Sequence, residues 1–286
     1  MAGTRLALLS AAATGIQVGT AITATRFVAQ DISPVSLAFL RYAIGVACLA
    51  PFLVSTPIRL ARRDIVPIAL LGIGQFGILI ALLNEGLQSV SAGRGALIFA
   101  SFPLLTLAFA ALIGHERISL AKLGGIALTL VGVALAVGDT STSRNTLTGE
   151  LLIVAAAATG AICSVLYRPY LRRYPALPVS AFAMAAAAVA LFVPALLTDL
   201  TTATVQLSTG ALAAILFIGV SSGSFYVLWL WALKTIAATR VTIFLALSPI
   251  TAMLLGHAFL GEPLTFALLL SIAFVGAGLW VANRAE

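Results

Sequence analysis

The sequence predicts an all-α integral membrane protein with ten transmembrane helices, arranged as two inverted five-helix repeats. Composition, the spacing of apolar segments and an internal repeat lead to this prediction. Of the 286 residues, 61% are hydrophobic and 9% are charged, whereas soluble domains carry about 25% charged residues. A chain with so little charge cannot cover itself with a hydrated surface, so we expect it to lie in the lipid bilayer.

The apolar segments have the length of membrane-spanning helices. Such a helix needs about 20 mostly apolar residues, because every backbone amide in lipid must be paired within the segment. Turn and charge signals such as Arg62, Arg63 and Asp64 separate the segments. Nine or eleven helices would also fit, because the connections at 89–92 and 234–237 are short. The ten predicted helices are residues 6–27, 34–54, 65–88, 93–113, 119–138, 150–170, 178–198, 209–233, 238–259 and 263–282.

The distribution of lysine and arginine predicts the orientation. With the N-terminus inside, twelve basic residues lie in inner loops or ends, and only Arg26, Arg94 and Arg144 lie outside. Cytoplasmic loops of membrane proteins carry the excess of basic residues. We therefore expect the chain in a bacterial inner membrane, with both termini on the cytoplasmic side. The net charge of +7 comes from these loop clusters, and it does not indicate nucleic-acid binding.

An internal repeat divides the chain into residues 1–140 and 148–286. The segment 11–15 recurs as 156–160, at an offset of 145 residues, which also argues against a signal peptide at the N-terminus. Four further pairs share an offset of 146 residues: Arg94 and Arg240, Pro103 and Pro249, Glu116 and Glu262, and Gly132 and Gly278. Because each half has five helices, the second half must enter the membrane from the opposite side. Inverted repeats of this kind are typical of transporters, which bind solute at the repeat interface.

Other classes of function fit the residues less well. An intramembrane enzyme would need a nucleophile and base, facing carboxylates or a zinc motif within the spans, and none is visible. Neither Cys48 and Cys163 nor His115 and His257 have metal-ligand spacing, so no metal or other cofactor is predicted. Gly72–Gly77 matches the letters of a dinucleotide fingerprint, but it lies inside an apolar helix, where glycines allow close helix packing.

Polar and aromatic side chains within the spans are the candidates for binding. Ser222, Tyr226 and Trp229 share one face of the helix 209–233. Read at an offset of 145, the corresponding face of the helix 65–88 carries Gly77, Ala81 and Asn84. An aromatic wall opposite a polar wall would suit an organic solute; the alternative is that the aromatic residues only pack or lie at the membrane interface.

Three further polar residues need a role inside the membrane. Gln17 lies on a stripe of the first helix that either faces a cavity or packs against another helix. Arg41 could pair with Glu85, bind a substrate anion or extend towards the interface. Glu85 is the one carboxylate inside a predicted span, apart from Glu150 at the first position of its span, so it is the candidate for proton coupling. Pro103 and Pro249 each remove a helix hydrogen bond and are the candidate hinges.

These residues resemble the drug/metabolite transporter superfamily, EamA type. The resemblance rests on Arg41 with Tyr42, and on a mid-helix proline followed by Gly and Glu, which occurs twice. It implies ten helices in two inverted halves and export of amino acids, other metabolites or drugs, with aromatic amino-acid exporters the most similar type. Many members have a tryptophan early in helix 1, where this chain has Gly15 and Gln17, and many end that helix in lysine, where it has Arg26.

Together these observations predict a secondary transporter that exports small organic solutes by alternating access, without a covalent step. The solutes are expected to be amino acids, some of them aromatic, or related metabolites; the alternatives are a proton-coupled multidrug efflux carrier and a passive channel. One central cavity is expected between the halves, with Arg41 as a carboxylate anchor. Its predicted lining is Gln17, Tyr42, Asn84, Tyr226, Trp229 and Ser248.

Overall fold

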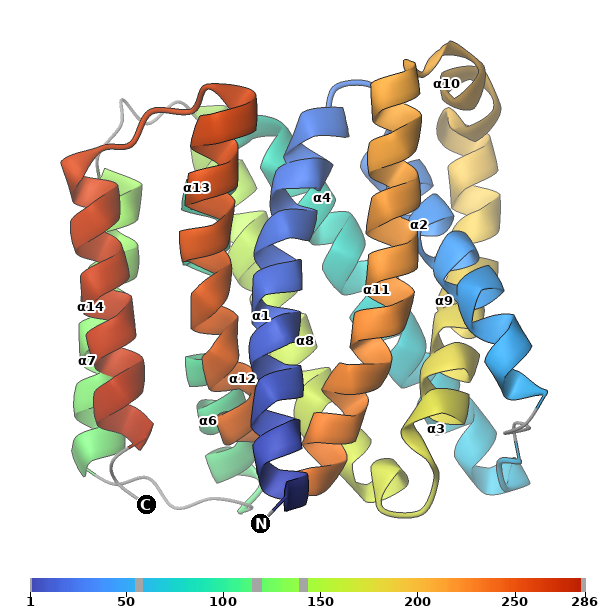
Figure 1. The fold of residues 1–286 in the computed structure, drawn as a ribbon, viewed down its shortest axis with the longest axis horizontal. Helices are drawn as coiled ribbons and strands as arrows, with labels where there is room; N and C mark the ends of the chain where they lie inside the picture. Colours follow the sequence, from blue (N-terminus) through green and yellow to red (C-terminus); the bar gives the residue numbers. More distant parts are fainter. Residues whose placement is uncertain (1, 55–58, 115–119, 139–143, 284–286) are drawn as a thin grey trace.

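The structure is a computed structural model, and it describes residues 2–54, 59–114, 120–138 and 144–283. These residues form α-helices with short 3-10 and π segments, and contain no β-strand. The helices stand roughly side by side across the molecule (Figure 1).

The helices fall into two series in chain order. In the first half they are α1 Ala2–Val28, α2 Pro34–Leu49 with η1 Ala50–Leu53, α3 Arg62–Gly72 with η2 Ile73–Ile78 and α4 Leu79–Ser89, α5 Ala92–Phe99, α6 Phe102–Leu112 and α7 Leu120–Gly138. In the second half they are α8 Arg144–Leu171, α9 Ala176–Thr198, α10 Leu200–Gln206, α11 Thr209–Thr235, α12 Ala238–Thr242 with η3 Ile243–Ala246 and α13 Leu247–Leu260, and α14 Phe266–Asn283.

Eight segments of the described chain are long and apolar enough to cross a membrane. They are Gly3–Val28, Pro34–Leu53, Arg62–Ser89, Ala92–Leu112, Thr146–Leu171, Ala176–Thr198, Thr209–Thr235 and Arg240–Leu260. Two shorter apolar stretches, Leu123–Gly132 and Phe266–Gly278, lie in α7 and α14. The prediction of an all-helical membrane protein is therefore confirmed.

Local sequence explains where several helices begin and end. The Ser33 hydroxyl accepts a hydrogen bond from the Ser36 amide, and Pro34 occupies the first turn of α2, where its missing N–H costs nothing. Ser91 and Ser208 cap α5 and α11 in the same way. Gly261 ends α13 in the left-handed conformation, with φ of 66°, which glycine adopts without strain.

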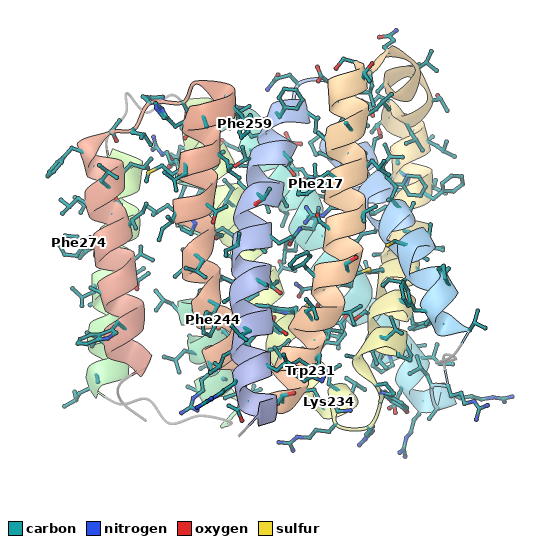
Figure 2. The ribbon with its side chains drawn as sticks, viewed as in Figure 1. Phe217, Trp231, Lys234, Phe244, Phe259 and Phe274 are labelled. Carbon is teal, nitrogen blue, oxygen red and sulfur yellow. The ribbon has the colours of Figure 1, made fainter. Side chains whose placement is uncertain are left out.

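The sides of the bundle are apolar and the charged groups gather at its ends. Phe217 and Phe259 are 44% and 78% exposed on the sides, whereas the exposed Lys234 lies at the lower end in Figure 2. Soluble monomers rarely expose such large apolar surfaces. Lipid tails can cover the sides of this bundle, while water can solvate its ends.

Helices from the two halves interleave. α1 packs against α11 and α13, and α8 packs against α4 and α6. α2 contacts both α9 and α11, while α7 and α14 lie against each other at one edge of the molecule (Figure 1). The largest cluster of buried apolar residues includes members of both halves, such as Tyr42 and Trp229, so neither half encloses it alone.

Glycines allow several of these helices to touch through their backbones. A Cβ atom added at Gly15 would lie 2.0 Å from the Phe244 carbonyl oxygen, and one at Gly72 would lie 2.3 Å from the Ala183 carbonyl oxygen. Lipid tails are as apolar as the helix surfaces, so close van der Waals packing holds the helices together. The glycine fingerprint at 72–77 therefore includes a packing contact between α3 and α9.

We expect Gly72→Ala to lower the stability of the purified protein by about 1–3 kcal/mol, because α3 and α9 must move apart to admit the methyl group. The matched control is Gly276→Ala in α14, where an added Cβ meets nothing within 4 Å. Thermal unfolding followed by size-exclusion chromatography measures both variants. Equal midpoints for the two variants would contradict this packing contact.

Both predicted hinge prolines follow an interruption of their helix. The segment 92–112 breaks between α5 and α6, with Pro103 in the first turn of α6. In the second half, the 3-10 turn η3 directly precedes α13, which contains Pro249. The missing N–H of Pro249 frees the Leu245 carbonyl, and the Ser248 hydroxyl donates to that oxygen at 2.7 Å. The helix is thus interrupted at matched places in the two halves, next to each predicted hinge proline.

Candidate functional site

A cavity lies between the two halves. The first half contributes residues of α1, α2 and the span 62–89 to its lining, and the second half contributes Ser222, Tyr226 and Trp229 of α11 and Leu245. Water-sized molecules can occupy about 80 Å³ of it. A single water needs about 10–15 Å³ on this measure, so the cavity has room for several waters or a small solute.

Aromatic rings form much of the cavity lining. The ring centroids of Tyr42 and Phe76 are 4.8 Å apart, and those of Phe76 and Tyr226 are 4.4 Å apart in an edge-on arrangement. The rings of Phe102 and Trp229 meet edge-on at 6.4 Å. Edge-on and tilted pairs are the favoured geometries of aromatic rings, so these side chains support one another and hold a fixed wall.

Arg41 is the one charged residue among the described residues that line the cavity. It is 7% exposed, and its Nε donates to the Ser222 hydroxyl at 2.7 Å. Its guanidinium carbon lies 5.6 Å from the centre of the Tyr42 ring, within the range of a cation–π contact. No described carboxylate lines the cavity, so the positive charge of Arg41 sets the electrostatic character of the site.

Three buried polar atoms of lining residues have no hydrogen-bond partner among the described residues. They are the Gln75 Oε1, the Tyr226 hydroxyl and the Trp229 Nε1. Leaving a buried donor or acceptor unpaired costs about 1–3 kcal/mol. These three groups place unused hydrogen-bonding capacity among the apolar lining residues of the cavity.

The structure brings together five of the seven residues predicted to bind substrate. Gln17, Arg41, Tyr42, Tyr226 and Trp229 line the cavity. The Gln17 amide also donates to the Ser221 hydroxyl at 3.0 Å, so its stripe both faces the cavity and joins α1 to α11.

Asn84 and Ser248, the other two predicted residues, are not among the lining residues of this cavity. The Asn84 amide donates to the Pro34 carbonyl at 3.0 Å, which ties α4 to the start of α2. Ser248 bonds the carbonyl that Pro249 frees.

The predicted pair of Arg41 and Glu85 does not form. Glu85 is exposed on α4, whereas the Arg41 guanidinium bonds the Ser222 hydroxyl. Of the roles considered for Arg41, facing a solute anion therefore fits its position best.

The sequence prediction missed Gln75, Phe76 and the other lining residues of the span 62–89. That prediction transferred the face of Ser222, Tyr226 and Trp229 at an offset of 145 residues. An offset of 146, which the downstream pairs share, points to Phe76, Ile80 and Leu83, and all three line the cavity. The offset of 146 residues was therefore the signal in the sequence that could have found these lining residues.

A buried ion pair links the halves beyond the cavity. Arg94 of α5 pairs with Glu150 at the start of α8, and the two side chains are 6% and 5% exposed. The sequence placed Arg94 in an outer loop and Glu150 at a helix end, so it did not predict this pair. Burying two charges is costly in lipid, and each charge here is stabilised by the other.

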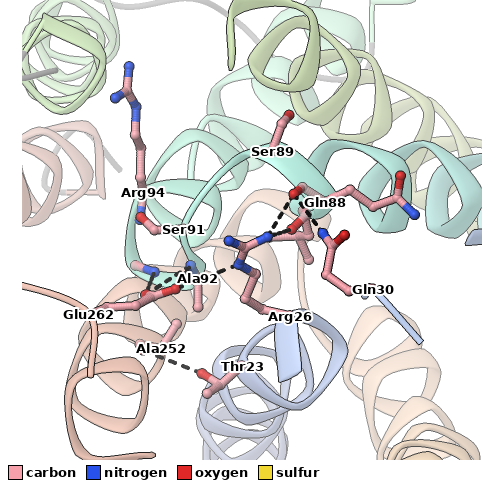
Figure 3. A network of polar contacts seen from close by, with 12 residues as sticks. Thr23, Arg26, Gln30, Gln88, Ser89, Ser91, Ala92, Arg94, Ala252 and Glu262 are labelled. Carbon is pink, nitrogen blue, oxygen red and sulfur yellow. Dashed lines mark hydrogen bonds and ion pairs between the residues drawn. The ribbon is translucent and has the colours of Figure 1, made fainter. Parts of the chain in front are cut away.

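A second polar network joins four chain segments (Figure 3) and includes Arg26, the residue after the lining residue Thr25. Both carboxylate oxygens of Glu262 accept from the Ala92 amide, at 2.9 and 3.0 Å, at the start of α5. Arg26 lies 3.9 Å from that carboxylate and donates to the carbonyls of Leu87 and Gln88, at the end of α4. The network therefore ties the end of α1, the end of α4, the start of α5 and the α13–α14 connection together. Glu116, the repeat partner of Glu262, lies outside the described residues.

Asp199 makes another contact between the halves. Its carboxylate accepts from the Ser33 amide and the Ser36 hydroxyl, both at 2.7 Å, which joins the end of α9 to the start of α2. Burial raises the pKa of Asp199, but the hydrogen bonds from Ser33 and Ser36 outweigh it and lower the pKa below its ordinary value. Because the folded pKa is lowered, this contact stabilises the fold above the ordinary pKa of aspartate. That stabilisation is lost as the pH falls through the lowered pKa.

Comparison with known protein families shows which family the chain belongs to. The model of the EamA-like transporter family matches twice, at residues 5–138 and 147–284. The chain belongs to the EamA-like transporter family. It is therefore a multi-pass membrane protein of a transporter family, and the resemblance drawn from its prolines and Gly–Glu turns is confirmed.

Curated EamA-like relatives cover most of the chain. An uncharacterized transporter of Archaeoglobus fulgidus is 26% identical over 93% of this chain and 94% of its own length. A probable terminal-alkyne amino-acid exporter of Streptantibioticus cattleyicolor is 29% identical, with 84% and 82% covered. A probable amino-acid metabolite efflux pump of Salmonella typhimurium is 24% identical, with 88% and 86% covered.

A solved structure shares the fold. One crystal structure superposes with a TM-score of 0.74 at 20% identity, covering 97% of this chain and 99% of the other. The family and these relatives indicate a transporter rather than an enzyme.

Proposed function

We propose that this protein exports small organic solutes, amino acids among them, by alternating access across the cytoplasmic membrane. The observation that carries the proposal is a cavity between the halves with aromatic walls, unpaired polar atoms and a single positive charge. Such a site suits a solute with an apolar body and an anionic group. Two relatives are named as an amino-acid exporter and an amino-acid metabolite efflux pump, which supports this class of substrate.

The proposal includes ten transmembrane helices in two inverted halves. The contacts of α1 with α11 and α13 are matched by those of α8 with α4 and α6, as expected if the halves are related by a two-fold axis. Arg26, at the end of α1, lies by Glu262, whose carboxylate accepts from the amide at the start of α5. Arg94 of α5 in turn pairs with Glu150 near the start of α8. α1 thus ends where its counterpart α8 begins, which supports opposite directions for the two halves.

The placement of basic residues supports cytoplasmic termini. The exposed basic residues lie at the end of the bundle where α1 starts (Figure 1). They are Arg62 and Arg63 at the start of α3, Arg172 and Arg173 just after α8, and Lys234 in the last turn of α11. At the opposite end, Arg26 and Arg94 bind carboxylates within the protein. By the positive-inside rule, the end with the exposed cations is cytoplasmic.

Labelling of single cysteines in intact cells tests this orientation. A membrane-impermeant maleimide added from outside should leave cysteines at 59–63 unreacted and should modify a cysteine at 144, because the first lie in the cytoplasm. Permeabilised cells provide the control, in which both positions should react. Protection of 144 together with reaction at 59–63 would reverse the topology.

The network of Arg26 and Glu262 would then close the outer end of the cavity. Glu262→Gln removes the charge that interacts with Arg26 and with the amides at the start of α5, so we expect the outward-open population to rise roughly tenfold. A cysteine at Thr25, which lines the cavity next to Arg26, reports this opening to an impermeant maleimide once Cys48 and Cys163 are replaced by alanine. Glu85→Gln, at an exposed position, is the matched control. Equal labelling rates in all backgrounds would contradict a closing role for Glu262.

The proposed function itself is tested with purified protein in liposomes. Vesicles loaded with one unlabelled amino acid should accumulate the same labelled amino acid by counterflow, and the flux should saturate with concentration. Empty liposomes provide the control. Saturation separates a carrier from a passive channel, and the absence of counterflow for every member of an amino-acid panel would contradict the proposal.

A further inference from the structure

Gln75 lines the cavity with a side-chain amide that has no assigned role in solute binding. It lies on η2, a π-helical turn in the middle of the span 62–89, and it is 7% exposed. π-helical turns occur frequently at functional sites. Gln75 lines the cavity, and its buried Oε1 has no hydrogen-bond partner among the described residues. Because this oxygen can only accept, it calls for a donor from whatever occupies the cavity.

The other polar groups of the cavity call for the opposite partner. Arg41 and the Trp229 Nε1 can only donate, so they need an acceptor from the solute. Arg41 lies on α2 and Gln75 on η2, two elements that contact each other. The positive donor and the unpaired acceptor therefore belong to side chains that line the same cavity from neighbouring elements.

This arrangement discriminates between three kinds of solute. An amine without a carboxylate would bring a second positive charge near Arg41, and no described carboxylate lines the cavity to compensate it. A carboxylic acid without an amine would pair with Arg41 but would leave the Gln75 oxygen unsatisfied. A zwitterion offers a carboxylate to Arg41 and an ammonium donor to Gln75, and the aromatic wall receives an apolar side chain.

We infer that Gln75 is a specificity-determining residue: its Oε1 accepts a hydrogen bond from the α-ammonium group of an amino acid whose carboxylate is bound by Arg41. Gln75 thereby selects amino acids over carboxylic acids of the same shape that lack the amine. This inference rests on the proposed function, since it names the solute group that one wall of the same cavity recognises.

The test compares three solutes with the same ring in proteoliposomes. They are phenylalanine, 3-phenylpropionate, which lacks the amine, and phenethylamine, which lacks the carboxylate. Wild-type protein should transport phenylalanine best and phenethylamine least. Gln75→Leu keeps the size of the side chain but removes the acceptor, so we expect the ratio of phenylalanine to phenylpropionate transport to fall about 10- to 100-fold, since a hydrogen bond to a charged group is lost. Gln206→Leu, the same substitution at an exposed position, should leave the ratio unchanged.

A second variant keeps the inference testable if Gln75→Leu does not fold. Gln75→Glu retains an acceptor and adds a negative charge beside Arg41, so it should preserve the preference for phenylalanine and raise phenethylamine transport at least tenfold. With wild-type protein transporting phenylalanine, either of two results overturns the role of Gln75 alone. One is an unchanged ratio of phenylalanine to phenylpropionate transport in folded Gln75→Leu, and the other is unchanged phenethylamine transport in folded Gln75→Glu. If wild-type protein transports none of the amino acids, the proposed function fails and this inference fails with it.

Discussion

Trp229→Ala is expected to reduce transport at least tenfold while the protein still accumulates in the membrane. Trp229 is 3% exposed, lines the cavity and meets the Phe102 ring edge-on at 6.4 Å. Alanine removes both the apolar face and the Nε1 donor that a solute would contact, and losing such an aromatic contact costs about 2 kcal/mol or more. One side of the ring borders empty space, so its removal should disturb packing less than it disturbs binding.

Initial rates of counterflow, normalised to folded protein, measure this effect. Trp231→Ala is the matched control, because Trp231 is on the same helix but does not line the cavity (Figure 2). Trp229→Phe restores a ring without the N–H group and should recover part of the rate. If Trp229→Ala transports as well as Trp231→Ala, the cavity is not the transport site.

Glu150→Leu is expected to cause the largest loss of stability of the substitutions considered. It leaves the Arg94 charge buried without its carboxylate, and breaking a buried ion pair in this way costs about 3–5 kcal/mol. We expect the midpoint of thermal unfolding to fall by about 10 °C. The cause is desolvation of one charge rather than loss of helix propensity, since leucine is a good helix former.

The double variant Arg94→Leu with Glu150→Leu separates this cause from simple damage to the α5–α8 contact. With both charges removed, an apolar pair can occupy the same buried site, so most of the lost stability should return. Thermal unfolding of the purified single and double variants measures the difference. A double variant no more stable than Glu150→Leu would show that the charges are not the reason for the loss.

The sequence predicted the helices and the main cavity wall because both depend on local pattern. Long apolar segments identify the spans, and residues spaced by i, i+4 and i+7 share a helix face, so Tyr226 and Trp229 were found together. Phe76, Ile80 and Leu83 were not found, because one-residue ambiguity in the repeat offset moved the predicted face to Gly77, Ala81 and Asn84. Such a shift turns a helix by about 100°, which is enough to exchange a cavity position for a packing position.

Contacts between distant segments were beyond prediction for a different reason. The Arg94–Glu150 pair and the bond from Arg41 to Ser222 depend on how helices from the two halves are placed against each other. A single sequence carries no measure of that placement. The sequence indicated that Arg41 needs a partner inside the membrane. The best partner visible along the chain was Glu85, which the fold leaves exposed.

The partners of the polar face of α1 have a consequence for how the chain is made. Thr14, Gln17 and Thr23 bond Phe225, Ser221 and Ala252, which lie 211, 204 and 229 residues away along the chain. Since the ribosome delivers the N-terminus first, α1 enters the membrane long before these partners are synthesised. Until then, the side-chain amide of Gln17 must bond to other groups, because hydrocarbon provides no hydrogen-bonding partner. The first five helices therefore cannot reach their final packing on their own, and assembly is completed only when α11 and α13 are inserted.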